Sequence, residues 1–278
     1  MLEATLPNLR MHLVSAFISL ILIIHQTQSN TCIAFASYPG NETDRTTLLA
    51  FKDKMMIEDP QGIMGSWNTS GKCAYQSRKL DESYKGDFFA NQLQAGPDGL
   101  SFITDLTNCT KLEVLDLGKN KFRGEIPASI ANFTDTLQYL VLGSNQITGN
   151  IPLEIENLNG LQVLTIHNND INGEIPHGIG KLQNLTYLYL WGNRISGAIP
   201  SSLGNATRLL RLALQYNQLE GDIPPSLGWC QQLQLLKLSD NNLNGTIPKE
   251  FISLSSLSIN FDVARNSLTG PLPLKWVT

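Results

Sequence analysis

One recurring segment constrains the fold of this chain more than any other feature. From Leu112 onward the pattern LxxLxLxxNxhxGxIP, in which h is apolar, occurs seven times. Its asparagine, glycine and proline return in phase every 24 or 25 residues. The positions are Asn120, Asn145, Asn169, Asn193, Asn217, Asn241 and Asn266; Gly124, Gly149, Gly173, Gly197, Gly221, Gly245 and Gly270; and Pro127, Pro152, Pro176, Pro200, Pro224, Pro248 and Pro273. Such a period predicts a solenoid, in which each repeat is one structural unit stacked on the next.

The leucines of each repeat predict a short strand. In Leu115-Asp116-Leu117, alternation sends the two leucines to one face and the residue between them to the other. A single repeat cannot bury its leucines, so neighbouring strands must stack about 4.8 Å apart as a parallel sheet. Short helical or irregular pieces such as residues 128–132 then close the outer side. We therefore expect an α/β solenoid with a parallel sheet on its concave face.

The other repeated residues have structural roles in this interpretation. The side-chain amide of the asparagine can bond backbone groups of its own turn and of the adjacent one, which would otherwise be buried unpaired. The glycine permits a bend with positive φ, and the Ile-Pro pair favours an extended segment. We expect the seven asparagines to form a ladder of hydrogen bonds along the solenoid.

Two segments carry a family resemblance. Residues 161–184, LQVLTIHNNDINGEIPHGIGKLQN, resemble the plant-specific leucine-rich repeat, which is distinguished by its Gly-x-Ile-Pro segment. Residues 43–73, TDRTTLLAFKDKMMIEDPQGIMGSWNTSGKC, resemble the N-terminal cap of plant leucine-rich-repeat receptor-like kinases and receptor-like proteins, in particular the immune type. The resemblance implies a small helical cap and a concave or flanking surface that binds a peptide, a protein or a small hormone. It also implies a membrane co-receptor kinase as a further partner.

This resemblance suggests a division of the chain. We assign residues 1–36 to a signal peptide, 43–73 to the cap, 74–105 to an irregular linker or degenerate repeat, 106–273 to seven repeats and 274–278 to a tail. Relatives continue into a C-terminal cap, a membrane helix and often a Ser/Thr kinase, none of which follows here, so we expect a truncated receptor-like protein. Its last repeat would leave Leu257, Phe261 and Leu268 near an open edge and reduce solubility.

The cysteines depart from the family pattern. Cap cysteines normally occur as Cys-x-Trp-x-Gly-Val-x-Cys, but Cys73 is followed by neither the Trp nor the second Cys. Cys73 could pair with Cys32 only if signal cleavage precedes Cys32. Cys109 and Cys230 occupy equivalent inward positions five strands apart, roughly 24 Å, which exceeds the ~7 Å limit for a disulfide. We expect both to be buried thiols.

The amino terminus predicts secretion. The apolar run from Leu13 to Ile24 follows Arg10 and His12 and precedes Ala34-Phe35-Ala36, a small-x-small cleavage pattern. A signal anchor or a buried helix is the alternative, but twelve apolar residues are short against the roughly 20 that cross a bilayer. Seven N-x-S/T acceptors agree with an extracellular location, in the apoplast or at the plasma membrane through a partner. They are Asn41, Asn68, Asn108, Asn132, Asn184, Asn205 and Asn244.

Composition and motifs argue against enzyme activity and against nucleic-acid or metal binding. The 20 basic and 24 acidic residues are scattered without runs, so no field attracts nucleic acid. The chain has no CxxC, no HExxH, no glycine-rich phosphate loop and no kinase motif. We therefore expect no enzyme activity, metal, cofactor, nucleotide or nucleic-acid partner. His167 and His177 lack a partnered nucleophile, and we expect them to be solvated surface residues.

The strand positions that the leucines do not use form a candidate binding surface. Stacked strands would gather their Tyr, Trp and Arg side chains into one patch on the concave sheet, and these residue types dominate binding energies at interfaces. They could instead only cover the sheet, since Tyr and Trp suit strand surfaces. The candidate ligand-binding residues are Tyr139, His167, Tyr187, Tyr189, Trp191, Arg211 and Tyr216.

Three functions remain open at this point. The first is an extracellular recognition module for a peptide or protein ligand, in plant defence or developmental signalling. The second is a secreted inhibitor of microbial wall-degrading enzymes, similar to polygalacturonase-inhibiting proteins. The third is a fragment of a receptor Ser/Thr kinase whose kinase is encoded beyond Thr278. A non-functional pseudogene product is also conceivable because the cap is damaged.

Overall fold

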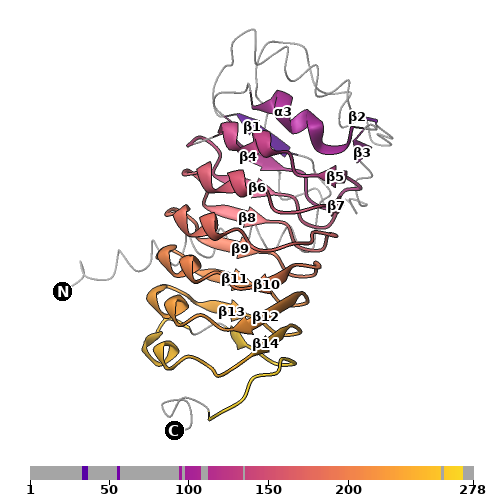
Figure 1. Cartoon of the computed structure of the whole chain (residues 1–278). Helices are drawn as coiled ribbons and strands as arrows, with labels where there is room; N and C mark the ends of the chain where they lie inside the picture. The colour runs from indigo at the N-terminus through magenta and orange to yellow at the C-terminus, as the bar shows by residue number, and fades with distance from the viewer. Residues whose placement is uncertain are drawn as a thin grey trace, which may run out of the picture.

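The chain winds into a stack of similar coils, one for each repeat (Figure 1). The computed structural model describes residues 98–107, 112–133, 135–257 and 260–271. It also describes the backbone of three short strands, β1 (Ile33–Ala36), β2 (Met55–Met56) and β3 (Gln94–Ala95). The predicted cap at 43–73 and the thiol of Cys109 otherwise lie outside the described residues.

An eight-stranded sheet follows one side of the stack. From β4 onward its strands are all parallel and each pairs with the strand of the next repeat, as the leucine alternation predicts. At the other end β1 pairs with β4 in the antiparallel direction. The remaining strands are β4 (Leu112–Asp116), β6 (Tyr139–Val141), β8 (Val163–Thr165), β9 (Tyr187–Tyr189), β11 (Arg211–Ala213), β13 (Leu235–Lys237) and β15 (Asn260–Asp262). Strand β1 consists of the last residues of the predicted signal peptide, so the structure describes the uncleaved chain. Cleavage of the signal peptide therefore stays a prediction.

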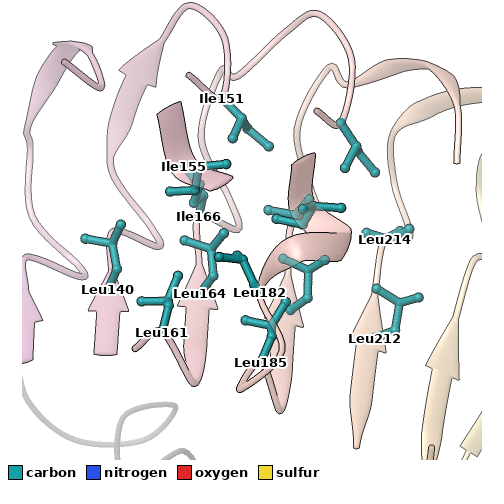
Figure 2. Packing of buried hydrophobic residues seen from close by; sticks show 14 of the residues in the cluster. Leu140, Ile151, Ile155, Leu161, Leu164, Ile166, Leu182, Leu185, Leu212 and Leu214 are labelled. Carbon is teal, nitrogen blue, oxygen red and sulfur yellow. The ribbon is translucent and has the colours of Figure 1, made fainter. Parts of the chain in front are cut away.

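One continuous hydrophobic core runs along the inside of the coils. Figure 2 shows leucines such as Leu140 and Leu164 together with Ile155 and Ile166, between the strands and the outer turns. All four are fully buried. A repeat therefore needs its neighbours to bury its leucines, and we expect a single isolated repeat not to fold.

Short 3-10 helices close the convex side, as expected from the sequence. They are η1 (Gly99–Ser101), η2 (Ala128–Phe133), η3 (Leu153–Asn157), η4 (His177–Lys181), η5 (Ser201–Asn205), η6 (Pro225–Trp229) and η7 (Lys249–Ser253). They pack closely: a Cβ added to Gly180 would lie 2.1 Å from the carbonyl oxygen of Ser202 in the next turn. The convex side thus depends on small residues at defined positions.

A second set of parallel strands, which the repeat pattern did not predict, lies beside the concave sheet. Strands β10 (Ser196–Ala198), β12 (Gln218–Asp222) and β14 (Asn242–Asn244) form a three-stranded sheet, and β5 (Arg123–Glu125) pairs with β7 (Gln146–Thr148). They come from the segment that contains the repeated glycine. The extended conformation before Ile-Pro was predicted, but the pairing of these segments across repeats was not.

The repeated asparagines form hydrogen bonds within and between coils. The Nδ2 of Asn193 donates to the carbonyl of Leu190 in its own turn at 2.9 Å and to that of Ile166 in the preceding one at 3.0 Å. Its Oδ1 accepts from the backbone N–H of Ile171 at 3.1 Å. The Oδ1 of Asn120, by contrast, has no partner among the described residues. The residue just before each of these asparagines has positive φ.

The hydrophobic core reaches both ends of the described solenoid. The expected linker at 74–105 ends inside the solenoid, because η1 and the following helix α3 (Phe102–Leu106) contribute buried residues such as Leu100 and Ile103 to the core. At the other end Leu257, Phe261 and Leu268 are partly buried against the core. Cys230 is fully buried and free, as predicted. Within the described residues, no helix combines the length and the apolar character that a membrane span requires.

Candidate functional site

Strand register brings most of the candidate residues together on the concave face. Tyr139, Tyr187 and Arg211 lie in one row across the sheet, with Val163 completing it. Tyr189 lies in the next row, beside Thr165 and Ala213. We call His167, Tyr187, Tyr189, Trp191 and Arg211 the concave patch. All five come from three neighbouring repeats.

One part of the patch is a pair of stacked rings. The imidazole of His167 and the indole of Trp191 are 4.7 Å apart between centroids and inclined by 14°. His167 lies over Gly143, where an added Cβ would come within 2.3 Å of the ring. Glycine is therefore needed at position 143 for the ring to lie close to the sheet.

His167 is not the solvated surface residue expected from the sequence. It is half-buried, and burial together with the positive charge of Lys119 lowers its pKa from 6.5 to about 4. Its imidazole is therefore neutral at mildly acid and at neutral pH. His177, in contrast, is exposed on η4 as expected.

The second part of the patch has two layers. Tyr187 is only 1% exposed, although it lies outside the continuous cluster of core residues that runs along the coils. The guanidinium of Arg211 lies over this ring at 5.4 Å and bonds the hydroxyl group of half-buried Tyr189. Burial raises the pKa of both tyrosines. Tyr187 therefore supports Arg211 and Tyr189, which reach further outward.

Tyr216 does not join the concave patch. It follows β11 in a positive-φ conformation, at 58°, and is 54% exposed. Its hydroxyl group bonds Arg265, which also forms an ion pair with Asp240. We expected Tyr216 on the strand face because it is a variable position just before the repeated asparagine, but it does not share the outward alternation of Arg211 and Ala213.

Three polar atoms in this region have no hydrogen-bond partner among the described residues. They are Oγ1 of Thr165, Nδ1 of His167 and Oε1 of Gln215. Thr165 is 1% exposed and faces the concave side between the core residues Leu164 and Ile166. Buried polar atoms without partners are costly, so this part of the face carries unsatisfied polar groups that the framework does not explain. Only their alternating strand positions could have indicated Thr165 and Gln215 from sequence.

A buried carboxyl group lies at the first repeat of the same face. Asp116 is 5% exposed, and burial raises its pKa to about 7, although the N–H of Gly118 and the charge of Lys119 oppose this shift. Burial in turn lowers the pKa of Lys119. At this end of the face, the raised pKa of Asp116 and the lowered pKa of Lys119 make both groups less readily charged than usual. Arg211 lies nearer the middle of the face.

The glycosylation sites differ in their surroundings. Asn132, Asn205 and Asn244 are exposed. Asn184 is half-buried, donates to the carbonyl of Asn159 at 2.9 Å and accepts from Arg208 at 2.8 Å. Asn41, Asn68 and Asn108 lie outside the described residues.

The parallel concave sheet, the asparagine bonds and the convex 3-10 turns define a leucine-rich-repeat solenoid. A family model described as a leucine-rich repeat region matches residues 93–220, and one described as a leucine-rich repeat matches residues 232–254. The region is of the type found in the ectodomains of plant receptor-like kinases, as the sequence predicted.

Individual relatives agree with this class. The chain is 50% identical over 64 residues to the LRR receptor-like serine/threonine-protein kinase EFR of Arabidopsis thaliana, and 45% identical over 61 residues to the receptor kinase-like protein Xa21 of Oryza sativa subsp. japonica. These matches cover 23% and 22% of this chain, and 6% of either relative.

Solved structures extend the likeness over more of the chain. The ectodomain of the Arabidopsis receptor kinase HAESA, in complex with an N-terminally extended IDA peptide hormone, has a TM-score of 0.68 and 31% identity, over 84% of this chain and 39% of that one. A HAESA complex with IDA and the co-receptor SERK1 has a TM-score of 0.60 and 34% identity, over 66% and 29%.

Proposed function

We propose that the chain is an extracellular recognition module whose concave patch binds an extended peptide or a protein segment, in plant defence or developmental signalling. The observation that carries the proposal is the grouping of Trp191, Tyr189 and Arg211 on one face, outside the core. Their ring faces and the guanidinium are the groups that most often dominate binding energies. The HAESA complexes with a peptide hormone support the same kind of ligand.

The side chains suggest how such a ligand is held. The outer face of the Trp191 ring offers apolar contact, and Arg211 offers donors to a carboxylate or carbonyl group. The chain's own residues bind and orient the ligand, and signalling would pass through a membrane co-receptor kinase.

The test uses the secreted full chain and a library of random peptides displayed on phage. Peptides selected on the immobilised chain are measured by calorimetry against the double variant Tyr189→Ala/Trp191→Ala. We expect Kd to rise at least about 100-fold, because two hot-spot side chains each contribute about 2 kcal/mol or more. Thermal unfolding should shift little, since neither ring is part of the core.

Trp229→Ala is the matched control, because it removes an indole from the convex side. It should leave Kd unchanged. Equal weakening by both variants, or a large fall in Tm of the double variant, would contradict a concave binding site. Inhibition of a fungal polygalacturonase by the chain would instead favour the inhibitor function.

A further inference from the structure

The convex surface carries an exposed tryptophan that concave binding does not use. Trp229 is the last residue of η6, and 60% of its surface is exposed. Within the described part of the chain its indole stacks on no ring and donates no hydrogen bond. An apolar ring of this size left in water forgoes roughly 2 kcal/mol of burial energy. Its position therefore raises the question of what covers it.

A glycosylation acceptor occupies the same position one repeat earlier. Asn205 is the last residue of η5, as Trp229 is of η6, and each lies five residues after the proline of its repeat. Asn205 begins the sequon Asn205-Ala206-Thr207 and is exposed. Its side-chain amide makes no hydrogen bond to any described residue, so the nitrogen is accessible.

Contacts between the two turns place these residues beside each other. The hydroxyl of Ser226 in η6 donates to the carbonyl of Ser201 in η5 at 2.6 Å. The thiol of Cys230, the residue after Trp229, lies 3.8 Å from the carbonyl oxygen of Gly204 and 3.6 Å from that of Ala206. Gly204 and Ala206 flank Asn205. The two exposed side chains therefore project from adjoining turns of one surface.

We propose that Trp229 is the binding platform for the first N-acetylglucosamine of a glycan on Asn205. A pyranose ring has one face of C–H groups, and these carry partial positive charge that matches the negative face of an indole. Stacking covers the apolar ring and holds the glycan against the convex side, away from the concave patch. The inference rests on the proposed extracellular function, because the glycan is added in the secretory pathway.

The chain contains its own matched control for this arrangement. Asn132 is an exposed acceptor five residues after Pro127, which is the same place in its repeat as Asn205. The corresponding residue of the next repeat is Asn157, the last residue of η3. A glycan on Asn132 therefore meets an amide where the glycan on Asn205 meets an indole.

The experiment uses the full chain secreted from yeast, with its glycans trimmed by an endoglycosidase to a single N-acetylglucosamine. Glycopeptide mass spectrometry gives the occupancy of each acceptor. NMR then records the N-acetyl methyl signals, which an aromatic ring shifts upfield when the sugar stacks on it. We expect the Asn205 signal to lie upfield of the Asn132 signal, Trp229→Ala to abolish the difference, and Asn157→Trp to move the Asn132 signal in the same direction.

Stability provides a second readout. Thr207→Ala removes the glycan without changing Asn205, and we expect it to lower Tm in the parent chain but not in the Trp229→Ala variant. An Asn205 signal that Trp229→Ala leaves unmoved, or an unoccupied Asn205 in a chain glycosylated elsewhere, would overturn the inference alone. A chain secreted without any glycan would count against the extracellular function as well.

Discussion

At the scale of single residues, the repeated positions were easier to predict than the variable ones. The role of Asn193 follows from spacing, because a buried turn leaves backbone groups that one amide can satisfy in every repeat. The surroundings of His167 depend instead on Gly143 and Trp191 of the adjacent repeats, 24 residues away on either side. Tyr216 was misplaced because a positive φ before the asparagine has no sequence signature when the residue is not glycine.

Removal of one ladder asparagine should be costly. Asn193→Ala leaves the backbone N–H of Ile171 without its side-chain partner. It also removes one of the two side-chain donors to the carbonyls of Ile166 and Leu190, which keep those from Asn169 and Asn217. We expect a loss of about 2–4 kcal/mol in the free energy of unfolding, measured by urea denaturation. Exposed Asn172→Ala should change it by about 0.5 kcal/mol or less. Similar losses in the two variants would refute the structural role of the ladder.

Stability should depend on pH through His167. Its folded pKa of about 4 lies below the unfolded value of 6.5, so the unfolded chain takes up the proton first as pH falls. This group therefore contributes stability above pH 6.5 that is lost between about pH 6.5 and 4, on the order of 2 kcal/mol after allowance for partial solvent screening. His167→Phe keeps an aromatic ring on Trp191 and should flatten this slope.

Chemical denaturation of the parent chain and His167→Phe at several pH values measures that difference. The raised pKa of Asp116 acts in the opposite direction over part of the same range, but it is common to both proteins. Parallel pH profiles would show that His167 titrates normally.

At the scale of elements, period and burial were enough to predict the concave strands and the convex turns. The leucine alternation identified the strand in Leu112–Asp116, and the segment 128–132 was recognised as a short helical piece. The second set of parallel strands, which includes β10, β12 and β14, was missed because these strands are polar on their exposed side, as in Gln218–Asp222. Their pairing results from stacking and has no hydrophobic signal of its own.

The close packing of the convex turns makes a specific prediction. Gly180→Ala places a methyl group 2.1 Å from the backbone oxygen of Ser202, which cannot move without separating two coils. We expect a loss of about 1–3 kcal/mol in stability from overpacking. Lys181→Ala in the same turn removes only an exposed ion pair with Glu156 and should cost less than about 1 kcal/mol. Thermal unfolding of the two variants shows whether the close packing of Gly180 or the ion pair of Lys181 contributes more to stability.

At the scale of the whole molecule, the solenoid follows from the repeat alone, since no other arrangement buries the leucines of every period. The face that gathers the candidate binding residues could be predicted by the same reasoning. The identity of a ligand could not, because binding energy at an interface depends on a few outward side chains, here candidates such as Arg211 and Trp191, and not on the repeated framework.

A solenoid should tolerate the loss of a complete coil. Deletion of residues 145–168, from one ladder asparagine to the residue before the next, removes 24 residues and joins Ser144 to Asn169 in register. We expect cooperative unfolding with a smaller urea m-value, because less surface is exposed. Deletion of residues 145–156 alone joins Ser144, just after the concave strand segment, to Asn157 at the end of a convex turn, and should prevent folding. Circular dichroism distinguishes the two outcomes.

The pairing of each strand only with its immediate neighbours also gives the molecule a mechanical character. A force applied to the ends of such a stack loads one boundary between coils at a time, so the terminal coil peels away while the others hold. Each such event releases about 24 residues, or roughly 80 Å of slack. The protein would then lengthen under tension in steps of similar size, because each step unfolds one repeat.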